Sequence, residues 1–289
     1  MIVITGATGA LNGATTEHLL TRLPAEELLV VAREPARAER FARRGVAVRH
    51  GDHAEPDTLV PAFAGADQLL LVSSSDPFAD AVALHTAAVD AAVRAGVGRV
   101  LHTSHQGASP RTPFGPGRDH AATEVVLERS GLPWTSLRNG FHAHSLARLA
   151  GDWRSTGSIA VPADGPVSWT AREDAAEAAA VVIARLAAGE TGLDGPLTLT
   201  ADEAPTFADV AALLSRAGGR HVERVLVEPE EWLAAQVRAG RPEAVARFAL
   251  AVFRAAAEGF FAQTSPLLAD LLTRRPATAL DALTTPRLH

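Results

Sequence analysis

A glycine-rich segment follows directly on the first apolar run of the chain, and it constrains the fold more than any other feature. Residues 2–5 read as a short buried strand, residues 6–9 are Gly-Ala-Thr-Gly, and a helical pattern comes next. Gly6 permits a sharp turn, and Gly9 lets the backbone approach a pyrophosphate that rests on the N-terminus of a helix. This context predicts a dinucleotide site, the alternative being a Gly-rich turn without a ligand. The expected cofactor contacts are Gly6, Thr8, Gly9, Ala10, Leu11 and Asn12.

Short apolar runs alternate with helical patterns through the first half of the chain. Some runs, such as residues 69–72, are continuously apolar, as strands of a parallel sheet buried on both faces are. The alternation predicts an α/β fold, a doubly wound parallel-sheet Rossmann fold with a smaller C-terminal α/β substrate-binding lobe. The expected strands are residues 2–5, 28–32, 46–50, 68–73, 99–103 and 134–138, and the expected helices are residues 15–23, 35–44, 57–63, 78–95 and 118–130.

The alternation ends near residue 140. Beyond it we expect strands at residues 167–170 and 197–200, and helices at residues 174–188, 207–217, 230–239 and 242–257. Residues 1–145 are therefore assigned to an NAD(P)-binding Rossmann core, to which residues 165–190 return, and residues 146–289 mainly to a substrate-binding lobe.

Composition excludes several classes of protein. The chain is 47% hydrophobic and carries a formal charge of -6 with no basic cluster, so nucleic acid is not an expected partner. No apolar run approaches the roughly 18 residues of a membrane span, and the N-terminus has no signal-peptide pattern. The absence of Cys excludes disulfides and thiolate metal sites. A cytoplasmic location is expected.

The end of the second expected strand indicates which dinucleotide is bound. An acidic residue about 20 positions after the glycine turn holds the ribose 2′-OH of NAD. This chain has Arg33 there, followed by Arg37 and Arg40. Since a guanidinium pairs well with a phosphate, NADP(H) is the preferred cofactor and NAD(H) remains possible. The alternative is that Arg37 and Arg40 form only the solvated face of a helix.

Several stretches spread over nearly the whole chain look familiar. They are residues 5–9, 31–33, 51–52, 71–75, 103–104, 137–140 (Leu-Arg-Asn-Gly), 170–175 and 267–283. In these the chain resembles the NmrA-like atypical short-chain dehydrogenases/reductases, and most closely their NAD(P)H:quinone oxidoreductase-like members. The resemblance implies cofactor contacts from Asp52, His53, Ser73, Ser74, Ser75 and Thr103, although residues 73–75 are alternatively an ordinary turn. It also implies that Thr103, Ser104 and Asn139 lie near the nicotinamide.

One position departs from that resemblance. The family pattern has a third glycine where this chain has Asn12, with Gly13 beside it. The third glycine permits close packing of helix and strand. Asn12 is therefore expected either to shift the helix or to add a side-chain contact to the phosphates.

The missing residue types limit the chemistry. The chain contains no Tyr, and all 27 of its basic residues are Arg, so it has no Lys. The Tyr and Lys pair of typical short-chain dehydrogenases is therefore absent, and an acceptor that stabilises its own reduced form, such as a quinone, is favoured. Polar groups near the strand ends are the candidates for catalysis, although each is alternatively a surface or core residue. They are His102, Ser104, His105, His120, Asn139 and His142.

Two further features concern the substrate. Residues 107–117 are rich in Pro and Gly and suit a lid or a substrate wall. Aromatic residues either line a pocket or pack in the core, and the core is favoured for Trp134; they are Phe114, Trp134, Phe141, Trp169, Phe253, Phe260 and Phe261. The His142-x-His144 pair lacks an evident third ligand, so no metal is expected, and there is no flavin motif.

The function favoured by the sequence is an NAD(P)H-dependent oxidoreductase that reduces a quinone or a related polycyclic aromatic molecule. One alternative is an NAD(P)-sensing regulatory protein of the NmrA-like group without turnover. Another is a tailoring enzyme of aromatic natural products whose reduced quinol reacts with oxygen, in the manner of a monooxygenase. The chain is a possible homodimer.

Overall fold

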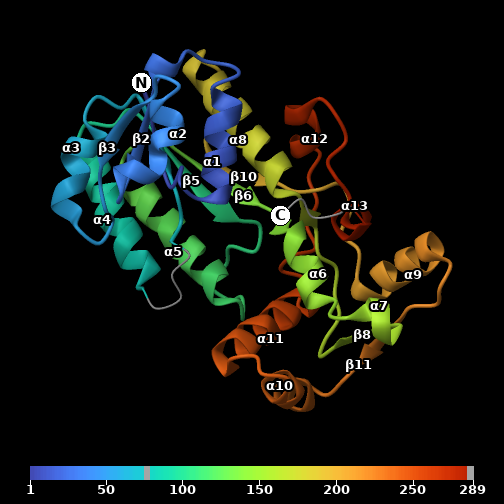
Figure 1. The fold of residues 1–289 in the computed structure, drawn as a ribbon. Coiled ribbons are helices and arrows are strands. Elements are labelled where there is room, and N and C mark those ends of the chain that lie inside the picture. The colour runs from blue at the N-terminus through green and yellow to red at the C-terminus, as the bar shows by residue number, and fades with distance from the viewer. Residues whose placement is uncertain (75–78, 285–289) are drawn as a thin grey trace. The chain divides into compact units, whose positions relative to one another are not determined.

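The computed structural model describes residues 1–74 and 79–284, which fall into two compact units (Figure 1). Unit 1 consists of residues 1–105, 119–138 and 175–197, and unit 2 consists of residues 106–118, 139–174 and 198–289. Residues 106–118 and 139–145, which the sequence places in the first domain, group with unit 2. Ser75 and the expected helix start at residue 78 lie outside the described residues.

A single large sheet forms the centre of unit 1. In the described ranges it has seven strands in the order β10-β6-β5-β4-β1-β2-β3, and β3, β2, β1, β4 and β5 pair in parallel. The order reverses between β1 and β4, and ligands of open α/β sheets bind at such a point, outside the carboxyl ends of the strands. The strands are β1 (Ile2–Thr5), β2 (Leu28–Ala32), β3 (Ala47–His50), β4 (Gln68–Leu71), β5 (Val100–His105), β6 (Trp134–Asn139) and β10 (Gly195–Leu199).

Helices cover both faces of this sheet (Figure 1). On β4, Leu69 packs in one apolar cluster with residues of α3, α4 and α5. The adjacent Gln68 points to the opposite face, where its Nε2 donates to the carbonyl of Ile183 in α8 (3.2 Å). The doubly wound α/β prediction is therefore confirmed. The helices are α1 (Ala10–Leu19), α2 (Glu39–Ala42), α3 (Leu59–Phe63), α4 (Ala81–Arg94), α5 (Gly115–Arg129) and α8 (Arg172–Ala187), with short 3-10 helices at Ala25–Glu27, Pro35–Ala38 and Pro56–Thr58.

Helix α1 begins five residues before the predicted start. It follows Gly9 directly, and the sequence prediction of a start at Thr15 was wrong. The hydroxyls of Thr15 and Thr16 donate to the carbonyls of Leu11 (3.1 Å) and Asn12 (2.6 Å) one turn earlier. Such back-bonding satisfies these polar side chains inside a helix, which allows α1 to run through them.

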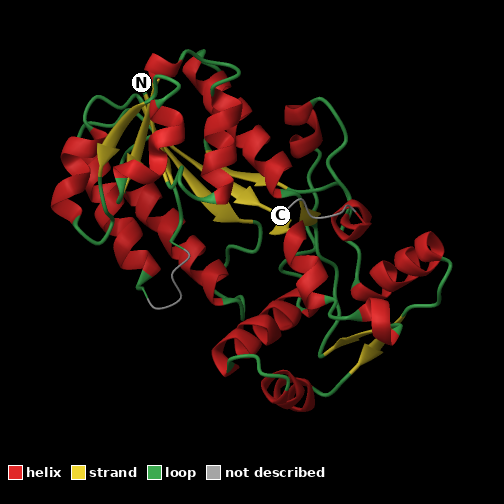
Figure 2. Ribbon diagram, viewed as in Figure 1, coloured by secondary structure: helices red, strands yellow, loops and turns green. Residues whose placement is uncertain are grey.

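Unit 2 combines two small parallel sheets with helices (Figure 2). One sheet pairs β7 (Phe141–His142) with β9 (Trp169–Thr170), and the other pairs β8 (Ser158–Val161) with β11 (Glu223–Leu226). No helix in the described ranges is long and apolar enough to cross a membrane. The helices are α6 (Leu146–Leu149), α7 (Trp153–Thr156), α9 (Phe207–Gly218), α10 (Pro229–Arg238), α11 (Glu243–Ala257), α12 (Leu267–Leu272) and α13 (Ala279–Thr284), with a 3-10 helix at Ala143–Ser145.

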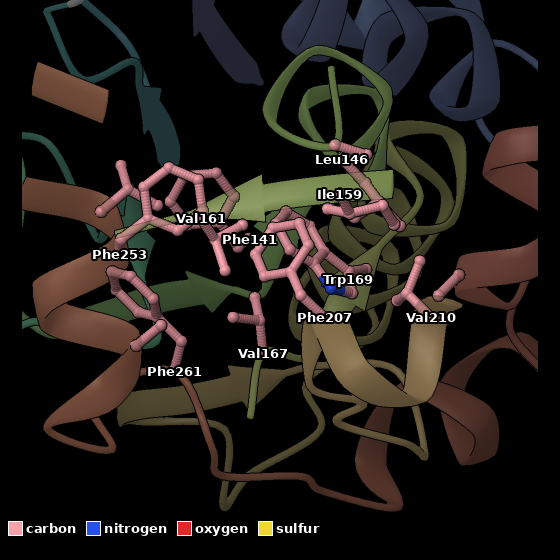
Figure 3. Packing of buried hydrophobic residues seen from close by; sticks show 14 of the residues in the cluster. Phe141, Leu146, Ile159, Val161, Val167, Trp169, Phe207, Val210, Phe253 and Phe261 are labelled. Atoms are coloured by element: carbon pink, nitrogen blue, oxygen red, sulfur yellow. The ribbon is translucent and has the colours of Figure 1, made fainter. Parts of the chain in front are cut away.

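Aromatic side chains fill the core of unit 2 (Figure 3). The ring of Phe207 lies between Trp169 and Phe253, with centroid distances of 5.9 and 5.3 Å. Most of the aromatic residues considered for a substrate pocket are thus core residues, and Trp134 packs against the unit 1 core as expected. The fully buried or nearly buried members are Phe114, Phe141, Trp169, Phe253 and Phe261, and Phe260 is partly buried.

Candidate functional site

The glycine-rich turn between β1 and α1 is shaped to receive an anion. Gly6 has φ +69°, and its carbonyl accepts the Gly9 N–H (2.9 Å). A Cβ on Gly9 would lie 3.2 Å from that carbonyl, so the backbone surface here is bare only because the residue is glycine. No side chain caps α1, and its first turn holds no acidic residue. The first N–H groups of α1 therefore remain available to a ligand, beside the exposed residues Thr8, Gly9 and Ala10 and the half-buried Leu11.

Asn12 and Gly13 together replace the third glycine of the family pattern. The Asn12 side chain is buried, and its Nδ2 donates to the carbonyl of Thr5 (2.9 Å), which ties α1 to β1. The Asn12 side-chain oxygen Oδ1 is buried and has no hydrogen-bond partner in the described residues. A Cβ on Gly13 would lie 2.9 Å from the Ala7 carbonyl oxygen and would collide with the Arg40 guanidinium. Close packing thus falls to Gly13, one position after the family's third glycine.

The three arginines after β2 differ in what they bind. Arg40 Nη2 donates to the Ala7 carbonyl (3.2 Å), so Arg40 supports the glycine turn from below. Arg37 forms an exposed pair with Glu34 (3.5 Å). Arg33 is exposed and makes no ion pair with a carboxylate in the described residues. Arg33 is therefore the guanidinium of this group that is available to a phosphate.

Asp52 and His53 follow β3 and lie close to Arg33. The Asp52 carboxylate accepts a hydrogen bond from the Ala54 N–H (3.0 Å), and the backbone N–H of Asp52 donates to Thr58 Oγ1 (2.9 Å). These two bonds fix the turn. Burial lowers the pKa of His53; Asp52 opposes this shift and Arg33 adds to it. His53 is therefore neutral at pH 7 and contributes polarity rather than charge.

The segment after β4 is held by hydrogen bonds from its backbone. The N–H of Ser73 donates to Thr103 Oγ1 (2.9 Å), and the N–H of Ser74 donates to His85 Nε2 (2.8 Å). Thr103 Oγ1 in turn donates to Ser73 Oγ (3.3 Å). These backbone groups are therefore engaged within the protein, and a contact from Ser73 or Ser74 to a cofactor has to come from hydroxyl or carbonyl groups.

Four histidines lie together at the carboxyl ends of the central strands of unit 1. His102 Nε2 lies 3.4 Å from His120 Nδ1, and the His102 ring is also 5.2 Å from the ring of His85. The ring of His105 stacks on that of His120 at 6.4 Å. Burial lowers the pKa of His85 and of His120 to about 4, and it also lowers the pKa of His102 well below its ordinary value. His85, His102 and His120 are therefore neutral near pH 7.

A buried carboxylate that the sequence analysis missed organises the same region. Glu124 Oε1 accepts from Ser104 Oγ (2.9 Å), Ser136 Oγ (2.7 Å) and Arg138 Nε (2.9 Å), and Arg138 also pairs with Oε2. Burial alone raises the pKa of Glu124, but these hydrogen bonds hold it below its ordinary value. Ser104 thus donates its proton to Glu124 and offers only lone pairs to a ligand. The signal in the sequence was the four-residue spacing from His120, which places both on one face of α5.

Asn139 and His142 belong to unit 2. Asn139 is buried, its carbonyl accepts the Gln106 N–H (2.9 Å), and its Oδ1 has no partner in the described residues. Burial, together with His144 and Arg172, lowers the pKa of His142 to about 4. The His142 and His144 rings stack at 5.5 Å, and no group of three or more metal-ligating side chains occurs in the described part of the chain.

The Pro/Gly-rich segment of residues 107–117 is internally bonded. The Ser109 N–H donates to the Gly117 carbonyl (3.2 Å), and Arg118 Nη1 donates to the Thr112 carbonyl (2.7 Å). A Cβ on Gly107 would meet the Phe261 ring at 2.7 Å, so the segment starts in close contact with the aromatic core. These contacts favour a fixed wall within unit 2 over a lid.

Known proteins to which the chain is similar are named as oxidoreductases or reductases. The profile of the NmrA-like family matches residues 1–258. Quinone oxidoreductase 2 of Escherichia coli (strain K12) is 31% identical over 285 residues, 98% of this chain and 97% of that protein. The NAD(P)H azoreductase of Xenophilus azovorans is 33% identical over 249 residues, 85% of this chain and 84% of that protein.

Solved structures agree with this placement. The NADPH-dependent quinone oxidoreductase of Escherichia coli, complexed with NADPH, matches with a TM-score of 0.89 and 31% identity over 98% of this chain and 99% of that one. The Citrobacter sp. triphenylmethane reductase complexed with NADP(H) has a TM-score of 0.85 and 31% identity, covering 98% of this chain and 99% of that one. The expected Rossmann architecture is thus shared with both.

Proposed function

This chain belongs to the NmrA-like family, as an oxidoreductase that uses a nicotinamide cofactor, and we propose that it transfers hydride from NADPH to a quinone or a related polycyclic aromatic acceptor. The family and its named relatives support the reaction class. The choice of acceptor rests on one observation, which is that burial lowers the pKa of His102 and His120 in unit 1 and that the Ser104 hydroxyl donates to Glu124.

The glycine-rich turn fits the cofactor. The bare surface at Gly9 and the uncapped start of α1 suit a pyrophosphate, and Arg33 suits the 2′-phosphate of NADPH. Asp52 and His53 are proposed to lie at the adenosine side, Ser73 and Ser74 beside the ribose and phosphates, and Thr103 near the nicotinamide. NADPH supplies the hydride. The preference for NADP(H) over NAD(H) is part of the proposal.

The neutral histidines change the catalytic hypothesis drawn from the sequence. An imidazole whose pKa is about 4 carries an extra proton in only about one molecule in a thousand at pH 7. His120 therefore acts as a neutral hydrogen-bond donor to a developing oxyanion, as neutral imidazoles do elsewhere. We keep His102 and His105 of unit 1 as proposed neighbours of the substrate, and we keep Ser104 as a hydrogen-bond acceptor held by Glu124. Asn139 and His142 of unit 2 stay candidate catalytic residues.

A quinone matches this set of groups. Hydride transfer to a quinone produces a hydroquinone anion whose charge is delocalised over the ring, so no strong acid has to act in the same step. Positioning of the acceptor supplies most of the catalysis in such a case. An isolated ketone, by contrast, gives a localised alkoxide that needs a proton donor the chain lacks in both Tyr and Lys form.

The test is stopped-flow absorbance at 340 nm with NADPH and a panel of quinones, run anaerobically and then with an oxygen electrode. The proposal expects NADPH to be consumed in equal amount to the quinone without oxygen. Tight NADPH binding with no oxidation by any quinone supports the sensing alternative instead. Turnover that depends on oxygen and yields an oxygenated product supports the tailoring alternative.

A further inference from the structure

Three consecutive backbone N–H groups after β4 are each held by a side chain from a different element. Val72 donates to Thr5 Oγ1 of β1 (2.8 Å), Ser73 donates to Thr103 Oγ1 of β5 (2.9 Å), and Ser74 donates to His85 Nε2 of α4 (2.8 Å). We call residues 72–74 the pinned segment. Thr5, Thr103 and His85 are all buried, so these bonds are shielded from water.

The direction of each hydrogen bond at His85 is fixed. Because Nε2 accepts from the Ser74 N–H, it carries no proton, and the proton of the neutral ring is on Nδ1. Nδ1 then donates to Thr123 Oγ1 (2.7 Å), whose own proton goes to the carbonyl of Asp119 (2.8 Å). His85 therefore links the pinned segment to α5 through a single tautomer, and the chain of donors has one consistent direction.

The pinned segment lies at the point where the strand order of the sheet reverses. It continues β4, and β4 is the neighbour of β1, which leads into the glycine-rich turn. A Cβ on Gly6 would lie 2.7 Å from Val72 Cβ, so the segment packs directly on the turn. Residues 72–74 therefore support, through Val72, the backbone that is proposed to hold the pyrophosphate.

We propose that His85 is a positioning residue of the cofactor site, which holds the Ser74 amide through Nε2 and thereby fixes the strand end that supports the glycine-rich turn. This inference rests on the proposed function. His85 itself touches no ligand in this account. With its N–H groups engaged, the pinned segment presents carbonyl and hydroxyl groups, which suit the hydroxyls of a sugar better than a phosphate.

Two substitutions separate the two ends of the imidazole. The terminal amide of Gln reaches the place of Nε2, so the oxygen in His85→Gln can still accept from Ser74. The shorter His85→Asn reaches only the place of Nδ1, so it can bind Thr123 but leaves the Ser74 amide unpaired. Thr86→Ala is the matched control on the same helix, because the Thr86 hydroxyl donates to the carbonyl of Val82 in that helix (2.7 Å).

The experiment measures the dissociation constant for NADPH by calorimetry, the steady-state constants, and the melting temperature of each variant. We expect His85→Asn to weaken NADPH binding about tenfold and to raise KM for NADPH with kcat changed by less than about threefold. We expect His85→Gln and Thr86→Ala to stay within about twofold of the wild type. In the wild type, nitrogen NMR is expected to show the proton of His85 on Nδ1.

Equal NADPH affinities for His85→Asn and His85→Gln, whether reduced or normal, would overturn the inference, because a role in packing alone does not distinguish the two amides. A proton on Nε2 of His85 would overturn it as well. If the wild type itself fails to bind NADPH, the proposed function falls first, and this outcome is distinct from binding that ignores the substitution.

Discussion

The chemistry open to the site of unit 1 depends on which of its polar side chains carry a proton and where they donate it. Ser104 and His105 look equally available in the sequence, yet the Ser104 proton is donated to Glu124 (2.9 Å). The histidines look like acids, yet burial lowers the pKa of His120 to about 4. The sequence predicts His and Ser side chains near the strand ends of unit 1, and the structure brings His102, His105 and His120 together there. The sequence could not supply their protonation, because burial and partners depend on tertiary contacts.

Arg33 is predicted to read the 2′-phosphate of the cofactor. It is exposed after β2 and has no carboxylate partner in the described residues, so its guanidinium is free to pair with a phosphate. Arg33→Asp should weaken NADPH binding at least tenfold and leave NADH binding within about threefold, which is measured by calorimetry. Arg37→Asp is the control, since Arg37 already pairs with Glu34. Equal losses for both cofactors would assign the preference elsewhere.

The buried histidines also predict how stability depends on pH. The pKa values of His85 and His120 are about 4 in the folded chain against an ordinary value of 6.5. Between these values the unfolded chain binds more protons, so their contribution is complete above pH 6.5 and is lost as the pH falls toward 4. We expect the melting temperature to fall from pH 6.5 to 5, a window in which ordinary carboxylates remain ionised.

His102→Gln provides the comparison for this pH dependence. The substitution removes another buried imidazole whose pKa lies well below its ordinary value. Its melting temperature should therefore change less between pH 6.5 and 5 than that of the wild type. A wild-type melting temperature that stays constant or rises as the pH is lowered from 6.5 to 5 would contradict the assignment of neutral histidines.

At the scale of elements, burial pattern determined which segments the sequence revealed. The bounds of β1 and β2 were predicted to the residue, because both are continuously apolar and buried. The strand β11 was missed, since Glu223–Leu226 is largely exposed and shows neither alternation nor an apolar run. The strand expected at residues 167–170 is present as the shorter β9, whereas β7 was missed because it has only two residues and its pairing with β9 is set by tertiary structure.

Substitution of Gly13 in helix α1 tests whether this residue provides the close packing that the family's third glycine provides. Gly13→Ala places a methyl group against the Ala7 carbonyl and the Arg40 guanidinium, and should lower the free energy of unfolding by about 1–3 kcal/mol. Gly218→Ala, at the end of α9, meets nothing within 4 Å and should be neutral or slightly stabilising. Chemical denaturation measures both. A Gly13→Ala variant as stable as the wild type would show that the Arg40 side chain moves aside at little cost in free energy.

At the scale of the whole molecule, the two units are interleaved along the chain. The sequence prediction divided the chain near residue 145 and returned residues 165–190 to the first domain, whereas the chain passes from one unit to the other five times. The remaining crossings are set by tertiary contacts, which composition and periodicity do not report. The same reason explains why Glu124 was missed: its partners Ser104 and Ser136 come from β5 and β6, and only the folded sheet brings them to α5.

The most direct test of the central claim is the pH profile of single-turnover NADPH oxidation by a quinone, followed at 340 nm between pH 5.5 and 8. We expect the rate of hydride transfer to the quinone to show no change around pH 6.5, because His85, His102 and His120 stay neutral throughout this range. A rate that falls about tenfold per pH unit above 6.5 would reveal an imidazolium acid and contradict the account. Absence of NADPH oxidation with every quinone, with NADPH tightly bound, would contradict it entirely.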